Sequence, residues 1–256
     1  MPGQSGKIAI VTGATEGIGH AIAQRLAQDG ATVALVARRA DVLAKVAQEL
    51  AGKGFAFPTD LADLRAIEAL IAQVVAKLGR IDIIVNCASA TRAGDVLSIP
   101  DHEWVAGFDV KVLGALRLVR AAWPELAKRH GAVISIGGIG ARTPRDGAAM
   151  TGPLSAALIA LTKVFADRGV QDGVRVNAIN PGAVLTPRLL SMLDQRAAKR
   201  SVSREEAITE MARATDCMRV GRPEDVANVV SFLLSDEAEL LHGAIIDLDG
   251  GATKGL

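Results

Sequence analysis

The first stretch whose residue types and spacing suit a chemical task is a glycine-rich turn near the N-terminus, residues 12–19. It reads TGATEGIG and lies between a short apolar run and a segment with helical spacing of apolar residues. Glycine lets the backbone approach a phosphate closely, and a helix N-terminus offers free N–H groups and a positive dipole end. A turn that only reverses the chain is the alternative. We expect a dinucleotide diphosphate to contact Gly13, Thr15, Glu16, Gly17, Ile18 and Gly19.

A second group with a chemical use is the arginine pair Arg38-Arg39, which directly follows the apolar run at residues 32–37. In dinucleotide-binding folds an acidic residue near this point bonds the adenine ribose of NAD(H), whereas an arginine suits the 2′-phosphate of NADP(H). Glu16 argues in the other direction, because its carboxylate would repel that phosphate if it pointed inward. A solvated basic pair is the alternative interpretation. The pattern favours NADP(H) over NAD(H).

The elements that must hold these groups are predicted by the apolar pattern, in which short buried runs alternate with segments of helical spacing. Strands of this length, separated by helices, form a parallel sheet covered on both faces. The sequence therefore predicts one α/β domain over residues 1–256, a Rossmann-type doubly wound parallel sheet of about seven strands. The expected strands are residues 7–12, 32–37, 55–59, 81–86, 132–136, 174–179 and 244–248, and the expected helices are residues 18–29, 42–51, 61–78, 104–126, 153–167, 188–216 and 224–234.

Composition excludes several classes of function. The net charge is +1, with 29 basic and 28 acidic residues well mixed, which argues against a nucleic-acid partner. Cys87 and Cys217 have neither metal-ligand spacing nor a disulfide framework, so no metal is expected. The N-terminus lacks an apolar signal core, and no apolar stretch is long enough to span a membrane. We expect a soluble, cytoplasmic protein.

Further motifs extend the pattern of the glycine turn along nearly the whole chain. Asp60-Leu61 follows the third expected strand, Asn86-Cys87-Ala88-Ser89 follows the fourth, and Asp249-Gly250-Gly251 follows the last. Together with T-G-x-x-x-G-I-G, these motifs resemble the short-chain dehydrogenase/reductase family. The resemblance implies a nicotinamide dinucleotide as cofactor. It assigns further cofactor contacts to Asp60, Leu61, Asn86, Ala88, Pro181, Gly182, Val184 and Thr186.

The family's usual catalytic residues are an asparagine, a serine, a tyrosine and a lysine, and this chain departs from that pattern. It contains no tyrosine at all. Residues 156–163 resemble the family's helix directly after the lysine, and this register assigns the four places to Lys111, Gly138, Thr151 and Ser155. The resemblance thus indicates a divergent member that lacks the tetrad. Thr151, followed by Gly152-Pro153, is expected to cap a helix, and Ser155 to be a packed helix residue.

Lys111 is the candidate for the missing proton donor. Its long side chain can reach the space left by the family's lysine, and desolvation lowers the pKa of a lysine enough for proton transfer. A lysine paired with Asp109 or with a surface carboxylate is the alternative.

Several arginines follow expected strands on the side where ligands bind in this fold. We hypothesise that they converge on an anionic small-molecule substrate, such as an acid or a CoA thioester. Pairing with Asp95, Asp146 and solvent is the alternative. Residues 188–217 resemble the family's substrate lid, and the resemblance implies a homodimer or homotetramer. The arginines in question are Arg92, Arg142, Arg145 and Arg188.

Three functions are compatible with these residues. The first is an NADP(H)-dependent oxidoreductase with a different proton source, acting on an activated C=O or C=C bond of a small or acyl-thioester substrate. The second is a catalytically inactive module or subunit that binds NAD(P)(H). The third is a non-redox enzyme, such as an isomerase or a dehydratase. The intact cofactor motifs favour the first function, and the missing tetrad keeps the second as its alternative.

Overall fold

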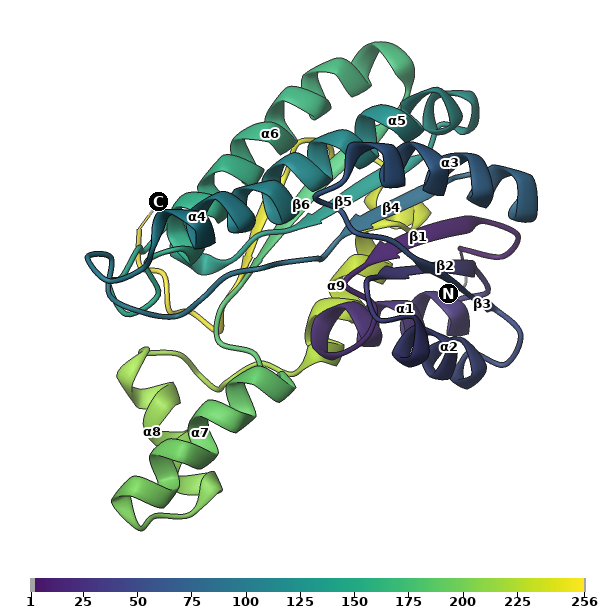
Figure 1. Ribbon diagram of the computed structural model, residues 1–256. Coiled ribbons are helices and arrows are strands. Elements are labelled where there is room, and N and C mark those ends of the chain that lie inside the picture. The colour runs from purple at the N-terminus through teal and green to yellow at the C-terminus, as the bar shows by residue number, and fades with distance from the viewer. Residues whose placement is uncertain (1–2, 256) are drawn as a thin grey trace.

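A parallel β-sheet forms the centre of the molecule (Figure 1). The structure, a computed structural model, describes residues 3–255. Its seven-stranded sheet has the order β3-β2-β1-β4-β5-β6-β7, and all neighbouring strands are parallel. The order reverses between β1 and β4, where doubly wound sheets bind their ligands. The strands are β1 (Ile8–Thr12), β2 (Thr32–Ala37), β3 (Gly54–Pro58), β4 (Ile83–Asn86), β5 (Ala132–Ile136), β6 (Arg175–Pro181) and β7 (Ile245–Leu248).

Helices cover both faces of the sheet (Figure 1). The central strands are apolar along their whole length, as in IAIVT of β1, so both of their faces need cover. The predicted doubly wound α/β fold is therefore confirmed. One face carries α1 (Gly17–Gln28), α2 (Ala40–Glu49) and α9 (Pro223–Leu233), and the other carries α3 (Leu64–Leu78), α5 (Gly114–Arg129) and α6 (Thr151–Asp172).

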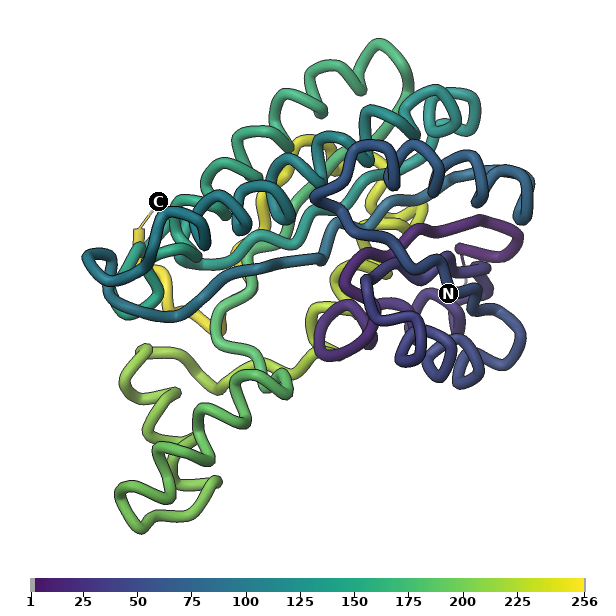
Figure 2. Tube along the Cα trace, viewed as in Figure 1, coloured from purple at the N-terminus to yellow at the C-terminus, as the bar shows by residue number. Residues whose placement is uncertain are grey.

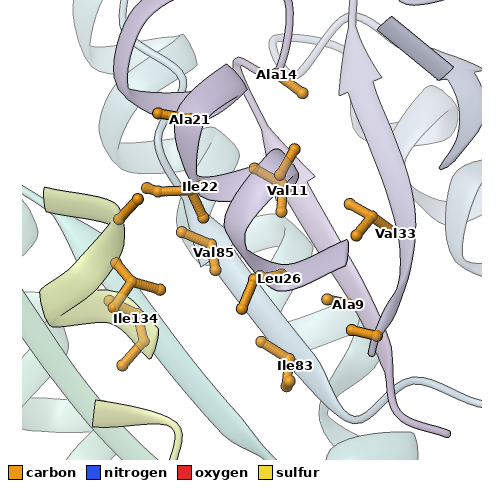
Figure 3. Close-up of a cluster of buried hydrophobic side chains, with 14 of the residues drawn as sticks. Ala9, Val11, Ala14, Ala21, Ile22, Leu26, Val33, Ile83, Val85 and Ile134 are labelled. Carbon is orange, nitrogen blue, oxygen red and sulfur yellow. The ribbon is translucent and has the colours of Figure 1, made fainter. Parts of the chain in front are cut away.

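The buried cluster beneath α1 holds the first β-α-β unit together (Figure 3). Ile22 and Leu26 of α1 and Val11 and Val85 of the adjoining strands are fully buried. Each such side chain contributes about 1.5–3 kcal/mol when it leaves water. The glycine turn between β1 and α1 is thus fixed at both ends by packed apolar side chains.

Two expected helices are divided in the structure. The helix expected at residues 104–126 consists of α4 (Asp101–Phe108), a π-helical turn (Asp109–Leu113) and α5. The segment expected to be helical at residues 188–216 consists of α7 (Pro187–Arg200) and α8 (Arg204–Ala214). Ser203 starts α8 through a capping box with Glu206, which separates it from α7. The two helices form a hairpin that projects from the body of the molecule (Figure 2).

Two kinds of feature are absent from the part of the chain that the structure describes. No helix there is both long enough and apolar enough to cross a membrane. No cluster of His, Cys, Asp or Glu side chains there is placed to hold a metal ion.

Candidate functional site

A cleft of about 340 Å³ opens beyond the carboxyl ends of β1 to β4, where the strand order reverses. The predicted residues that line it are Gly13, Thr15, Glu16, Arg38, Arg39, Asp60, Leu61 and Ala88. Each of the other lining residues lies within two positions of one of these or of Lys111, and this closeness in sequence was the available signal. These unpredicted lining residues are Val36, Ala37, Thr59, Ser89, Ala90 and Val110.

The glycine turn after β1 is shaped for an anion. Gly13 and Gly17 have φ angles of 67° and 60°, a region that favours glycine. A Cβ added at Gly19 would overlap the carbonyl oxygen of Gly13, so only glycine fits where the helix meets the turn. The Gly13 N–H donates to Val36 O of β2. The N–H groups of residues 15–18 have no acceptor within the described chain, and such free amides at a helix N-terminus bind anions.

Thr12, a residue that the sequence analysis did not assign to the site, fixes one wall of the cleft. Its Oγ1 accepts hydrogen bonds from Cys87 N at 2.9 Å and Ala88 N at 3.1 Å. The same hydroxyl donates to Val85 O at 3.3 Å. The loop after β4 is thereby held against the start of the glycine turn.

The two arginines after β2 have different surroundings. Arg39 Nη2 lies 3.2 Å from Glu16 Oε2 and 3.2 Å from Thr15 Oγ1, so its guanidinium is held against the glycine turn. Arg38 is exposed and makes no side-chain hydrogen bond or ion pair within residues 3–255. The Glu16 carboxylate, expected to oppose a bound phosphate, is therefore already paired, and the Arg38 guanidinium is free.

The structure brings together the residues assigned to the catalytic places. Lys111 lies in the π-helical turn with only 5% of its surface exposed. Its Nζ donates to Gly137 O at 3.0 Å and to Ser155 Oγ at 3.1 Å. A Cβ at Gly138 would lie 3.3 Å from Ser155 Oγ and 3.4 Å from Thr151 Cγ2. The Lys111 ammonium thus lies against the residue that holds the lysine's place in the family pattern.

One alternative and one expectation for this cluster are wrong. Lys111 does not pair with Asp109, whose Oδ1 lies 3.5 Å from Arg117 Nη2. Thr151 does not cap a helix, because α6 begins at Thr151 itself and no side chain caps it. A turn in which the Thr151 N–H donates to Ala148 O at 2.9 Å leads into the helix and moves its start before Pro153.

Burial sets the charge state of this cluster. It lowers the pKa of Lys111 from its ordinary 10.5 to about 8. It also raises the pKa of the neighbouring Cys87 thiol to about 12, so that this thiol stays neutral. Lys111 is therefore a cation at neutral pH that gives up its proton more readily than an ordinary lysine.

Comparison with known proteins decides the family. A family model described as Enoyl-(Acyl carrier protein) reductase matches residues 13–253. Oxidoreductase UcpA of Salmonella typhimurium (strain LT2) is 35% identical over 254 residues, which cover 97% of this chain and 95% of that protein. The chain belongs to the short-chain dehydrogenase/reductase family.

Solved structures of similar proteins share the fold of this short-chain dehydrogenase/reductase. L-sorbose reductase from Gluconobacter frateurii, complexed with NADPH and L-sorbose, has a TM-score of 0.94 and 31% identity, covering 100% of this chain and 99% of that chain. The 3-ketoacyl-(acyl-carrier-protein) reductase from Brucella melitensis, complexed with NADH, has a TM-score of 0.85 and 25% identity, covering 97% of this chain and 98% of that chain.

Other residues that the resemblance assigns to the cofactor do not line the cleft of this short-chain dehydrogenase/reductase. Thr186 caps α7 through Leu189 N at 3.3 Å, and its Cγ2 lies 3.1 Å from the place of a Cβ at Gly17. Asn86 is buried at the end of β4, its Nδ2 lies 3.5 Å from Ser135 Oγ, and its Oδ1 has no partner within the described residues. The remaining predicted residues outside the cleft lining are Gly17, Ile18, Gly19, Pro181, Gly182 and Val184.

Four arginines were predicted to contact an anionic substrate, and two of them form ion pairs with carboxylates of the chain. Arg92 pairs with Glu103, and Arg142 Nε lies 3.3 Å from Asp247 Oδ2. Neither partner is one of the aspartates expected as alternatives. These two arginines therefore offer little free charge to a ligand.

The other two of these arginines, Arg188 and Arg145, form no ion pair within the described residues. Arg188 Nη1 donates to Thr91 Oγ1 at 3.1 Å, a neutral acceptor. This bond joins the start of α7 to the loop after β4. The Arg145 side chain is exposed and has no partner within residues 3–255.

The buried Lys111 of this short-chain dehydrogenase/reductase is expected to reduce the stability of the fold. A pKa of about 8 in place of 10.5 corresponds to a cost of about 3 kcal/mol for burying the charged amine. Lys111→Met removes that cost and also two hydrogen bonds. We expect the variant to raise the free energy of unfolding at about pH 7 by about 1–3 kcal/mol. Urea denaturation measures this difference.

The stability gained by Lys111→Met is expected to decrease as the pH rises. Between about pH 8 and 10.5 the unfolded chain holds the Lys111 proton and the folded chain does not. The stability of the wild-type protein therefore rises with pH over this window, and the advantage of Lys111→Met shrinks. An advantage that stays constant from pH 7 to about pH 10 would show that Lys111 is not charged and buried in the folded protein.

Proposed function

We propose that this protein is an NADP(H)-dependent oxidoreductase that reduces an activated C=O or C=C bond, with Lys111 in place of the family's tyrosine. The observation that carries this proposal is the buried Lys111 ammonium at the carboxyl end of β5, next to Ser155 and Gly137. A proton donor is most effective when its pKa lies near the working pH, and burial brings Lys111 to about 8.

The cleft has groups that suit a phosphorylated dinucleotide. The free amides of residues 15–18 fit a diphosphate, and the unpaired Arg38 fits the 2′-phosphate of NADP(H). Asp60 and Leu61, on the same cleft, are the proposed contacts of the adenine. The structural relative L-sorbose reductase is complexed with NADPH, which supports the same choice. When bound, the reduced dinucleotide supplies a hydride to the reacting carbon.

Lys111 supplies a charge and a proton in this proposal. An ammonium group has three N–H donors, and two of them are held by Gly137 O and Ser155 Oγ. The third has no acceptor within the described residues and is available to the carbonyl oxygen of a substrate. The positive charge stabilises the negative charge that develops on this oxygen during reduction, and the N–H then passes its proton to it.

The hairpin of α7 and α8 is proposed to act as the substrate lid. It leaves the body of the molecule directly after Thr186, which lies against Gly17 of the glycine turn. Arg188, in its first turn, bonds Thr91 of the loop after β4. Movement of this hairpin would open and close the mouth of the cleft. Assembly into a homodimer or homotetramer stays a prediction.

The absence of tyrosine favours one competing function, an inactive module that only binds the cofactor. Two measurements separate the two functions. Fluorescence titration detects NADPH binding, and loss of NADPH absorbance in the presence of ketones, 2-oxo acids and enoyl thioesters detects turnover. We expect binding and turnover with at least one class. Binding without any turnover would favour the inactive module.

The coenzyme preference is tested at Arg38. Arg38→Ala is expected to weaken NADPH binding by about 10- to 100-fold, because a charged hydrogen bond to phosphate contributes about 1.5–3 kcal/mol. NADH binding should not change, because NADH lacks that phosphate. Calorimetric titration with both coenzymes measures the two affinities. Arg129→Ala, which removes an exposed arginine at the far end of α5, is the matched control. Equal losses for NADPH and NADH would contradict the assignment.

A further inference from the structure

One charge in the catalytic cluster has no counter-charge. Lys111 is buried, and both of its hydrogen-bond acceptors, Gly137 O after β5 and Ser155 Oγ of α6, are neutral. Among the described residues, the one ionisable group that acts on it is the Cys87 thiol after β4, which burial keeps neutral. No carboxylate within residues 3–255 forms an ion pair with it. Because buried charges in proteins are normally paired, the missing partner is expected to come from a ligand.

Two arginines on segments that follow strands of the sheet also lack a carboxylate partner within the described residues. Arg188 is bonded only to the neutral Thr91 hydroxyl, and Arg145 is exposed without a partner in the described chain. The neighbouring carboxylates of Glu103 and Asp247 are already engaged by arginines. Cationic side chains without a carboxylate partner attract ligands of the opposite charge.

We propose that the substrate is a 2-oxo acid, a small carbonyl compound with a carboxylate on the carbon next to the reacting carbonyl group. Lys111 has a single N–H left for a ligand, so one direction of approach must satisfy both the reacting oxygen and the missing negative charge. In a 2-oxo acid the ketone oxygen and a carboxylate oxygen lie on adjacent carbons and can face the same N–H together. An uncharged ketone would satisfy the hydrogen bond and leave the charge unpaired.

The inference rests on the proposed function for the reaction itself. The ketone carbon gains a hydride, with its electron pair, from the reduced dinucleotide. The ketone oxygen gains the proton of Lys111, and the product is a 2-hydroxy acid that keeps its carboxylate. The neutral amine then regains a proton from water.

Proton uptake on binding tests the inference without any turnover. Oxamate, an unreactive anion with the shape of the smallest 2-oxo acids, is titrated into the protein at about pH 8.5 in two buffers of different ionisation enthalpy. At this pH most of Lys111 is neutral in the free protein, because its pKa is about 8. Pairing with the anion raises that pKa, so we expect an uptake of about half a proton for each bound oxamate.

Two variants and one neutral probe complete the test. Lys111→Met should abolish the uptake, and Lys45→Met, which removes an exposed lysine of α2, should preserve it. Ethyl oxamate, the uncharged ester, should cause none. Absence of oxamate binding, binding without uptake, or uptake that persists in Lys111→Met overturns the inference. Proton uptake on oxamate binding without any NADPH oxidation would instead contradict the proposed reduction, and it would still support a binding site for an anion beside Lys111. Oxidation of NADPH by neutral ketones, with no proton uptake when oxamate is added, would support the proposed reduction and contradict the 2-oxo acid as substrate.

Discussion

Lys111→Met is expected to lower kcat for NADPH-dependent reduction by about 10²- to 10⁴-fold, the usual contribution of a positioned general acid. The variant loses both the positive charge and the proton that stabilise the developing oxyanion. NADPH binding should persist, because the free amides of residues 15–18 and the guanidinium of Arg38 are unchanged. Steady-state NADPH oxidation gives kcat, and fluorescence titration gives the affinity for NADPH.

The pH profile separates a proton donor from a group with a merely structural role. In the wild-type protein the rate should fall as the pH rises above about 8, because only protonated Lys111 donates. The residual rate of Lys111→Met should lack this fall, and Lys45→Met should reproduce the wild-type profile. A Lys111→Met variant that keeps its activity would exclude Lys111 as the acid. A wild-type rate that does not fall between about pH 7 and pH 10 would contradict the assignment as well.

The loss of activity and the gain of stability that we expect for Lys111→Met have a common cause. A buried cation without a counter-charge is costly in the free protein and useful when a negative charge develops beside it. Ser155, Gly137 and the π-helical turn hold that cation in place. Sites of this kind commonly exchange stability for activity. A packed structural lysine would show the gain of stability without the loss of rate.

The sequence predicted the fold well because apolar periodicity is a local signal. Each of the seven strands coincides with an expected apolar run, within about three residues at its ends. The π-helical turn at Asp109–Leu113 was missed, since its Lys111 is held by Gly137 and Ser155, which are distant in sequence. The division between α7 and α8 was missed as well, although the Ser203–Glu206 capping box is a readable signal.

The sequence indicated which residues follow the strands that border the cleft, but it did not indicate which side chains would pair. Gly13, Thr15 and Glu16 of the glycine turn line one cleft together with Arg38, Arg39, Asp60 and Ala88, whereas Gly17, Ile18 and Gly19 do not line it. The partner of Glu16 could not be predicted, because Arg39 lies on another strand end and either arginine suits a carboxylate. The partners of Lys111 were similarly hidden, since a lysine beside Asp109 is compatible with a surface ion pair. Periodicity locates such residues on elements, and only the packed structure determines which of them meet.

Gly19→Ala is expected to weaken NADPH binding by about 100-fold and to lower the free energy of unfolding by about 2–4 kcal/mol. The added Cβ would overlap the Gly13 carbonyl oxygen, which is rigid backbone. The helix start must therefore move away from the turn, and the free amides of residues 15–18 lose their common orientation. Calorimetric titration with NADPH and urea denaturation measure the two effects.

Gly147→Ala is the matched control for this substitution, because a Cβ at Gly147 would meet no atom within 4 Å. It should leave both the affinity for NADPH and the free energy of unfolding nearly unchanged. If Gly19→Ala lowered stability but left the affinity intact, the turn would be needed for packing alone and the diphosphate would bind elsewhere. If it weakened NADPH and NADH binding equally while Arg38→Ala weakened only NADPH binding, the two substitutions would separate the diphosphate contact from the 2′-phosphate contact. The latter is the result that the free amides and the unpaired Arg38 together predict.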